Sequence, residues 1–339
     1  MNEILASLAA NAANPAVLFF LIGLAASLLK VELPLPGGFR TVLTVYLMAA
    51  IGFKGGVAVS ETGLAAIWLP ALVVALLGAV QPVWLYPLAR YAGRMAHVDA
   101  IALSATYASV SAVTFASAMS QLTVAGIPFE GSAPALMAVM EVPGVIVALG
   151  LHQWMTARSA AAAAPAAIQG AGTSSLGVLM GAVTEVLRSK SVFVLVASLG
   201  AGFLAGPPGM ALTKGFFVDP FQGLLTLFLL EMGLEAGARL GALRRTGPFL
   251  LAFGLLLPLA QGALGVALGD LIGLSVGGAT LMGVLSASAS YIAAPAAVRS
   301  MVPEANPSIY ITSALGITFP FNVVIGIPLY LAFAQYLAQ

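Results

Sequence analysis

Ala108-Ser-Val-Ser111 recurs as Ala287-Ser-Ala-Ser290, roughly 180 residues further along the chain, and this repetition decides the fold. A second stretch, Ile51-Gly-Phe-Lys-Gly-Gly56, recurs as Met232-Gly-Leu-Glu-Ala-Gly237 at nearly the same separation. Similarity at a constant offset indicates two copies of one structural unit. If each copy crosses a bilayer an odd number of times, the two copies point in opposite directions. Many secondary transporters build one binding site near the membrane midplane from such copies.

The composition indicates an integral membrane protein. Of the 339 residues, 60% are apolar and 7% are charged, whereas soluble domains have about 25% charged residues. The 37 Gly and 20 Pro residues favour interrupted helices, which a membrane tolerates where neighbouring helices satisfy the freed backbone groups. The chain has no Cys, which excludes disulfides and thiolate metal sites. Its sequence has no phosphate-loop or zinc-hydrolase motif, so we expect no cofactor, no transition metal and no enzymatic chemistry.

Apolar runs of about 20 residues are needed to cross a membrane, and they predict ten spans, five in each half. The predicted organisation is a first repeat at 1–157, a cytoplasmic linker rich in small residues at 158–190, and a second repeat at 191–339. The predicted spans are 15–30, 41–59, 64–90, 99–125, 132–156, 191–206, 220–241, 247–270, 275–300 and 306–337.

Charge predicts the orientation of these spans. Lys and Arg near span ends remain on the cytoplasmic side. If the N-terminus is outside, Lys214 is the only Lys or Arg residue in the outer loops, and Lys54 falls within a span. All the other Lys and Arg residues then lie at the cytoplasmic ends of the spans. We therefore expect a multi-pass protein of a bacterial inner membrane with both termini on the outer side.

The serine motifs predict where the fourth and ninth spans are interrupted and cross. Small residues between hydroxyls let two backbones approach closely, and Pro295 favours a break just before it. An interruption leaves free C=O groups at the end of the first half-helix and free N–H groups at the start of the second. The C=O groups attract cations, and the N–H groups attract anions. The alternative is that the hydroxyls bond only to their own helices. The predicted anion-binding residues are Ser109, Ser111, Thr114, Ser288 and Ser290.

Polar side chains in the fifth, eighth and tenth spans predict a cation site. An intramembrane carboxylate such as Glu141 costs about 2.5–3.5 kcal/mol to insert and usually faces a polar path or partner. Oxygen ligands suit a hard cation such as sodium. The predicted ligands are Glu141, Gln261, Thr318 and Asn322. The alternative is that Glu141 only makes a structural hydrogen bond between neighbouring helices.

The second repeated stretch predicts helix packing. Lys54 and Glu235 occupy equivalent positions and could form an embedded ion pair, although Glu235 could equally pair with Arg239, one helical turn along. The flanking glycines indicate close helix packing. They are Gly52, Gly56, Gly233 and Gly237. The two histidines, His97 and His152, lack the spacing of a metal site.

Three stretches resemble the family of sodium-dependent bicarbonate transporters of cyanobacteria and many other bacteria. They are Ser286-Ala-Ser-Ala-Ser-Tyr-Ile-Ala-Ala-Pro295, Leu315-Gly-Ile-Thr-Phe-Pro-Phe-Asn322 and Ser109-Val-Ser-Ala-Val-Thr-Phe115. The resemblance implies ten helices in two inverted repeats, with core and gate domains each drawn from both repeats, assembled as a homotrimer. It implies that the anion lies near Ser109, Ser111, Ser288 and Ser290. In cyanobacterial relatives a PII-like regulatory protein binds the cytoplasmic face.

The sequence therefore predicts a secondary active transporter that uses sodium as coupling ion to import a small anion, with bicarbonate favoured. Alternatives on the same fold are a sodium-coupled organic anion symporter and a sodium/proton antiporter. A proton exchanger would need a carboxylate at the crossing, and neither serine motif supplies one. A membrane enzyme would need His152 to reach a serine motif. A receptor or scaffold that does not transport is a further class. No nucleic-acid partner is expected.

Overall fold

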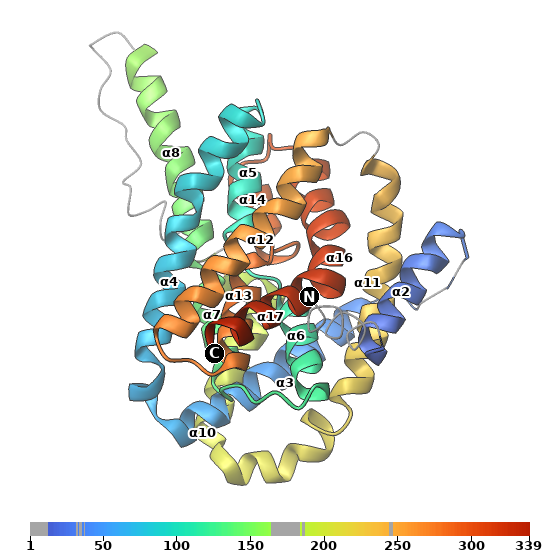
Figure 1. The fold of residues 1–339 in the computed structure, drawn as a ribbon. Helices are drawn as coiled ribbons and strands as arrows, with labels where there is room; N and C mark the ends of the chain where they lie inside the picture. The colour runs from blue at the N-terminus through green and yellow to red at the C-terminus, as the bar shows by residue number, and fades with distance from the viewer. Residues whose placement is uncertain are drawn as a thin grey trace.

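The computed structural model describes residues 13–31, 33, 36, 38–163, 184, 187–243 and 247–339. Most of the predicted linker, 164–183 and 185–186, lies outside the described residues. Within the described ranges all regular secondary structure is helical (Figure 1). The helices are α2 (Pro15–Leu28), α3 (Phe39–Thr62), α4 (Leu64–Pro87), η1 (Leu88–Ala92), α5 (His97–Tyr107), α6 (Ala112–Val124), α7 (Ala133–Met140), α8 (Pro143–Ala163), α10 (Lys190–Phe217), α11 (Phe221–Leu243), α12 (Pro248–Leu271), α13 (Val276–Ala287), α14 (Ala293–Met301), α15 (Pro307–Ile311), η2 (Thr312–Thr318), α16 (Phe319–Phe321), η3 (Asn322–Gly326) and α17 (Ile327–Leu337).

Seven helical stretches in the described part of the chain are long and apolar enough to cross a membrane. Helices α2 and α13 are shorter apolar helices. The predicted all-helical membrane class is therefore confirmed. The seven stretches are Phe39–Thr62, Leu64–Ala92, His97–Val124, Ala133–Thr156, Lys190–Phe217, Pro248–Leu271 and Pro307–Leu337.

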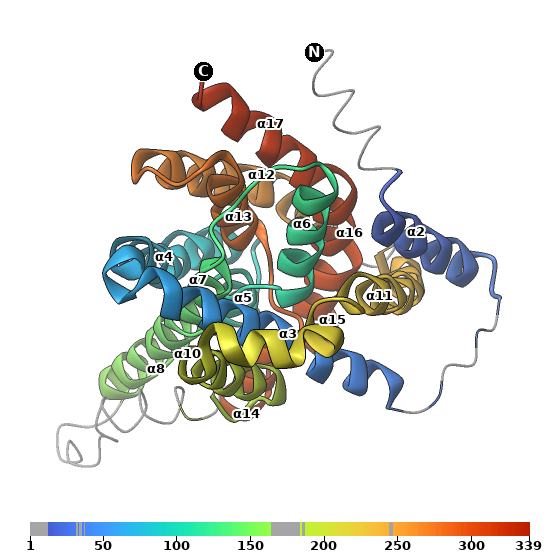
Figure 2. The same cartoon turned by 90° about the horizontal axis from the view of Figure 1, so that it is seen from below.

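Two pairs of helices lie side by side along much of their length. Helix α3 packs along α10, and α2 packs along α11 (Figure 2). Gly52 and Gly56 of α3 face backbone carbonyl oxygens of α10 so closely that a Cβ atom would collide with them. Gly233 of α11 faces a carbonyl oxygen of α2, and Gly237 faces the side chain of Ser27. Small residues at these four positions permit the close approach on which helix association in lipid depends.

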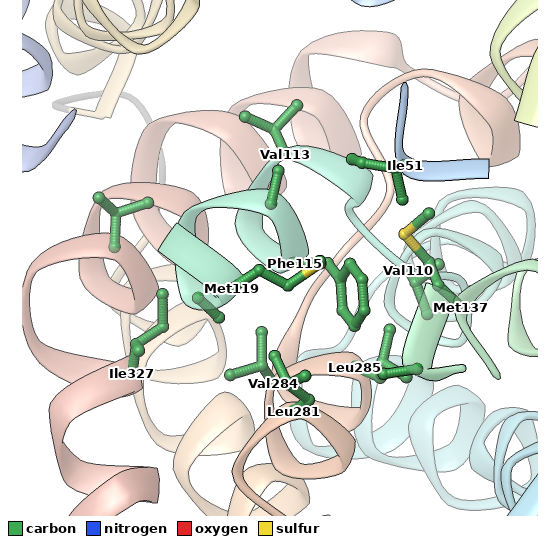
Figure 3. Close-up of a cluster of buried hydrophobic side chains, with 14 of the residues drawn as sticks. Ile51, Val110, Val113, Phe115, Met119, Met137, Leu281, Val284, Leu285 and Ile327 are labelled. Carbon is green, nitrogen blue, oxygen red and sulfur yellow. The ribbon is translucent and has the colours of Figure 1, made fainter. Parts of the chain in front are cut away.

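The remaining helices form a second group, in which α6 packs against α13. Phe115 of α6 is fully buried and points toward Val284 and Leu285 of α13 (Figure 3). Met137 of α7 and Ile51 of α3 belong to the same cluster. Because lipid tails are as apolar as these side chains, close packing rather than escape from water stabilises the cluster. Helix α12 packs along α13, and α4 and α5 both pack on α8.

Antiparallel packing of α3 on α11 explains which charges meet. Arg40 near the start of α3 pairs with Glu235 at 3.0 Å and with Glu231 at 2.9 Å. Arg239 pairs with Glu235 at 2.8 Å, which is one of the two pairings that the sequence allowed. Lys54 lies about 21 Å from Arg40 along the axis of α3. Its Nζ is 3.9 Å from the centroid of the Phe221 ring, at the opposite end of α11 from Glu235. Lys54 and Glu235 therefore do not form the other expected pair.

A glycine of α11 tests the close packing on α2. Replacing Gly233 with Ala should lower the free energy of unfolding by about 1–3 kcal/mol, because the new methyl group collides with the backbone of α2. Gly223→Ala in the same helix is the matched control, since a Cβ there meets nothing within 4 Å. The control should gain up to about 1 kcal/mol from helix propensity. Tryptophan fluorescence during denaturant unfolding in detergent measures both, and equal stabilities would contradict the packing.

Candidate functional site

The first interruption lies between α5 and α6. Helix α5 ends at Tyr107 and α6 begins at Ala112. Ser111 has an extended backbone, with φ −103° and ψ 107°, and caps α6. Its Oγ accepts hydrogen bonds from the backbone N of Thr114 at 3.2 Å and from the Thr114 hydroxyl at 2.9 Å. A serine at this position satisfies one of the free N–H groups that open a helix.

The second interruption lies between α13 and α14. Helix α13 ends at Ala287, and the next helix begins at Ala293. Pro295 is in the first turn of α14, where its missing N–H has no partner within the helix to lose. Ser290 Oγ accepts from the backbone N of Ala294 at 3.3 Å. Both predicted interruptions are therefore present.

The two interruptions hydrogen-bond to each other. The backbone N–H of Ser111 donates to Ser288 Oγ at 3.0 Å, and the backbone N–H of Ser290 donates to the Thr106 carbonyl at 2.9 Å. The four motif serines are all at most 4% exposed. The N-termini of α6 and α14, which carry the positive ends of the helix dipoles, therefore begin within one buried region.

A small cavity of about 20 Å³ lies at this crossing, the room that one or two water molecules need. Ser111 and Ser290 line it, together with Glu141 and Tyr291. Helix α3 closes one side of it. The other lining residues are Thr44, Met48, Val110, Ala112, Val113, Ser191, Ile292 and Ala293.

The other three predicted anion-binding residues do not line this cavity. Ser109 donates to the Glu141 carbonyl at 3.2 Å and lies 3.5 Å from the Glu141 carboxylate. Ser288 holds the backbone of Ser111, and Thr114 bonds to Ser111. These three residues therefore position the cavity wall, while Ser111 and Ser290 form it.

The last carbonyl groups of α13 are satisfied by side chains. Ser288 Oγ donates to the Leu285 carbonyl at 3.0 Å, and Gln81 Nε2 donates to the Ser286 carbonyl at 3.3 Å. Asn322 Nδ2 donates to the Ala287 carbonyl at 2.9 Å. Because lipid offers no hydrogen bonds, these donors are needed where the helix ends inside the membrane.

The predicted sodium ligands have different neighbours. Glu141 is 5% exposed and lines the cavity. Thr318 hydrogen-bonds to Tyr107 at 2.6 Å and to the Gly254 carbonyl at 2.8 Å. Asn322 also accepts from Tyr330 at 2.9 Å. Among the described residues, no hydrogen bond joins any two of the four predicted ligands.

Gln261 is the most unusual of the four. Its side chain is 2% exposed, and neither amide atom has a hydrogen-bond partner in the described part of the chain. An unsatisfied buried amide costs about 1–3 kcal/mol, so each one needs an explanation, such as an ion or a water. Gln81 of α4 also has an unsatisfied Oε1 atom.

Sequence reasoning missed the residues that frame the site from other helices. Tyr107, fully buried, ties the end of α5 to Ser313 at 2.7 Å and to Thr318. Thr44 and Met48 reach the cavity from α3. Tyr107 and Tyr291, which flank the two serine motifs, had a signal in the sequence, since an aromatic hydroxyl in a span needs a partner.

The two histidines, which the sequence did not connect, lie together. His97 Nε2 is 3.1 Å from His152 Nδ1. His152 thus contacts a second imidazole, and no described hydrogen bond joins it to a serine of either motif, as the enzyme alternative would require. In the described ranges, no group of three or more His, Asp or Glu side chains could hold a metal ion.

Fold and site define a class: a multi-pass α-helical membrane protein with a buried polar cavity at the crossing of two interrupted helices. The sequence profile of the Na⁺-dependent bicarbonate transporter superfamily matches residues 15–335. The chain therefore belongs to this superfamily, which confirms the resemblance of its serine motifs and places it among transporters rather than enzymes. A comparison with curated proteins finds no match.

A phenol-to-phenyl substitution tests the anchoring of α5. Tyr107→Phe removes the partner of Ser313 and one partner of Thr318, both buried. We expect the free energy of unfolding in detergent to be about 1–3 kcal/mol lower than that of the wild type. Tyr336→Phe, at an exposed position, should change nothing. If the two variants are equally stable, the hydroxyl does not anchor this end of the helix.

Proposed function

We propose that this chain imports a small anion, bicarbonate above all, together with sodium. The observation that carries the proposal is the crossing, where the N-termini of α6 and α14 begin beside one buried cavity. Helix N-termini favour anions because their N–H groups are free and the dipoles are aligned. Membership of the superfamily supports sodium and bicarbonate as the transported pair.

The chemistry of the cavity suits a small oxyanion. Ser111 and Ser290 provide hydroxyl groups that can donate to oxygen atoms and accept from the single O–H of bicarbonate. The space of about 20 Å³ favours an ion of a few atoms over an organic anion, for which the walls would have to separate much further. Ser109, Ser288 and Thr114 would act indirectly, by holding the loops that carry these hydroxyls.

Glu141 offers a physical reason for coupling to sodium. A carboxylate on the cavity wall repels an anion, and two unit charges 4–5 Å apart interact by about 3–4 kcal/mol at an effective dielectric constant of 20. A sodium ion at Glu141 would remove this repulsion. Gln261, Thr318 and Asn322 are the further oxygen ligands that we propose. Sodium would then raise the affinity for the anion, and the anion would raise the affinity for sodium to the same extent.

We further propose ten membrane helices in two inverted repeats of five, 1–157 and 191–339, joined by a cytoplasmic linker at 158–190. If two repeats are related by symmetry, a contact between two spans should recur between the counterparts of those spans in the other repeat. Helices α2 and α3 are the first two spans of the first repeat, and α10 and α11 are the first two of the second. The contacts α2–α11 and α3–α10 are therefore equivalent under this symmetry. Two loop contacts follow the same rule. Glu130 before α7 accepts from Ser275 N at the start of α13 at 2.7 Å, and Asp99 at the start of α5 accepts from Asn306 N before α15 at 2.8 Å.

In this arrangement α2, α3, α10 and α11 form a gate, and the other helices form a core that moves against it when anion and sodium are both bound. The core would slide or rock past α3, carrying Ser111 and Ser290 between the two sides of the membrane. By family resemblance we propose a homotrimer, a bacterial inner membrane with both termini outside, and a PII-like regulatory partner on the cytoplasmic side.

A proton exchanger is the second candidate, because Glu141 brings to the cavity the carboxylate that the serine motifs lack. The two functions differ in what sodium drives. Liposomes that contain a pH-sensitive dye should report no sodium-driven proton efflux when bicarbonate is absent. Such efflux, with no uptake of labelled bicarbonate, would favour the exchanger.

Uptake by proteoliposomes tests the anion site. A sodium gradient should drive uptake of labelled bicarbonate, and Ser290→Val should reduce uptake to the background of empty liposomes, because the added methyl groups fill the cavity. Ser300→Val is the matched control, exposed on α14, the helix that follows Ser290, and should transport normally. Uptake that ignores sodium, or survives in Ser290→Val, would contradict the proposal.

Gln261 tests the sodium site separately. At a sodium concentration one hundred times the dissociation constant, bound sodium should stabilise the wild type by about 2.7 kcal/mol. Gln261→Leu should lose most of this gain yet remain folded without sodium, since its amide has no protein partner in the described chain to lose. Thermal unfolding in sodium and in choline measures the difference, with the half-exposed Gln153→Leu as control. An unchanged sodium effect would exclude Gln261 as a ligand.

A further inference from the structure

A second cavity shares no lining residue with the first. Its volume is about 380 Å³, and it is lined by residues of α4, η1, α5 and α8. Helices α4, α5 and α8 lie side by side there, at the top of Figure 1. The lining residues are Tyr86, Arg90, Tyr91, His97, Met155 and Thr156.

A chain of hydrogen bonds holds two lining residues of this cavity, Tyr86 and His97, and continues to His152, which does not line it. The Tyr86 hydroxyl is 2.9 Å from His97 Nδ1, and His97 Nε2 is 3.1 Å from His152 Nδ1. The two imidazole rings are stacked, with centroids 5.1 Å apart. Residues from three helices are thereby locked in one arrangement, so the wall is built rather than formed by loose side chains.

Arg90 adds hydrogen-bond donors beside Tyr86 and His97, which line the same cavity. A guanidinium can only donate, and that of Arg90 lies close to the Tyr86 hydroxyl.

The charge of the cavity is positive. Arg90 lines it, and no carboxylate does. Nη1 of Arg90 donates to the Met95 carbonyl at 2.7 Å, which fixes the guanidinium and leaves its other N–H groups for a ligand. Two carboxylates lie outside the lining: Asp99 accepts from Asn306 N at 2.8 Å, and Glu304 lies near His152. A fixed guanidinium with further donors suits oxyanions that can take two parallel hydrogen bonds.

We propose that this cavity binds a phosphate monoester group. Its volume falls in the range of small-molecule sites, about 300–1,000 Å³, and is far larger than a bare inorganic ion needs. Tyr91, 71% exposed, extends the site at its rim toward the organic part of the ligand. A phosphate monoester group occurs both in free phosphorylated metabolites and in the headgroup of the lipid phosphatidate. In the orientation proposed above, the cavity opens on the cytoplasmic side.

Binding to the purified full chain in nanodiscs tests this site without any transport measurement. Three probes are used: inorganic phosphate, glycerol 3-phosphate, and phosphatidate at 10% in phosphatidylcholine. We expect glycerol 3-phosphate or phosphatidate to raise the melting temperature of the wild type, and which of the two does so identifies the source. Binding should weaken at least tenfold in Arg90→Gln.

Arg299→Gln is the matched control, because Arg299 is an exposed arginine that, like Arg90, donates to a backbone carbonyl. Its binding should equal that of the wild type. Ser290→Val should bind normally too, which separates this site from failure of the proposed transport. The proposal is overturned if no monoester binds, if Arg90→Gln binds as well as Arg299→Gln, or if bicarbonate competes for the same site.

Discussion

The structure depends on two hydrogen bonds between helix interruptions, from Ser111 N–H to Ser288 Oγ and from Ser290 N–H to the Thr106 carbonyl. Inside a bilayer a broken helix exposes backbone groups that lipid cannot satisfy. Each interruption here provides a hydrogen-bond partner for a backbone group that the other exposes. We therefore expect neither interruption to persist without the other. Close packing of Phe115 on α13 brings the two into register, and side chains of Gln81 and Asn322 satisfy carbonyls that remain.

In the proposed function, this arrangement is what would let a nearly uncharged interior hold an anion. The hydroxyls of Ser111 and Ser290 and the adjacent helix N-termini give a positive potential without a buried cation, whose desolvation would cost several kcal/mol. Glu141 provides the one negative group of the cavity lining, so the proposed site would favour an anion and a cation together over either alone. The charged network of Arg40, Glu231, Glu235 and Arg239 lies instead between α3 and α11, the helices of the proposed gate.

The sequence predicted what depends on local chemistry. Pro295 and the spaced serines indicated the interruptions, and the paired glycines of α3 and α11 indicated close packing. It could not predict which hydroxyls face the cavity, because that depends on side-chain direction within irregular segments: Ser109 and Ser288 turn away. Nor could it connect His97 with His152, or Arg40 with Glu231, since residues 55 and 191 positions apart meet only through the packing of separate helices.

An experimental structure in nanodiscs, determined once with sodium and bicarbonate and once with choline and no bicarbonate, tests the central claim most directly. The account predicts that α5–α6 and α13–α14 are interrupted in both structures. It predicts anion density within hydrogen-bonding distance of Ser111 and Ser290 only in the first. A continuous helix through either serine motif, or anion density elsewhere with this cavity empty, would contradict it.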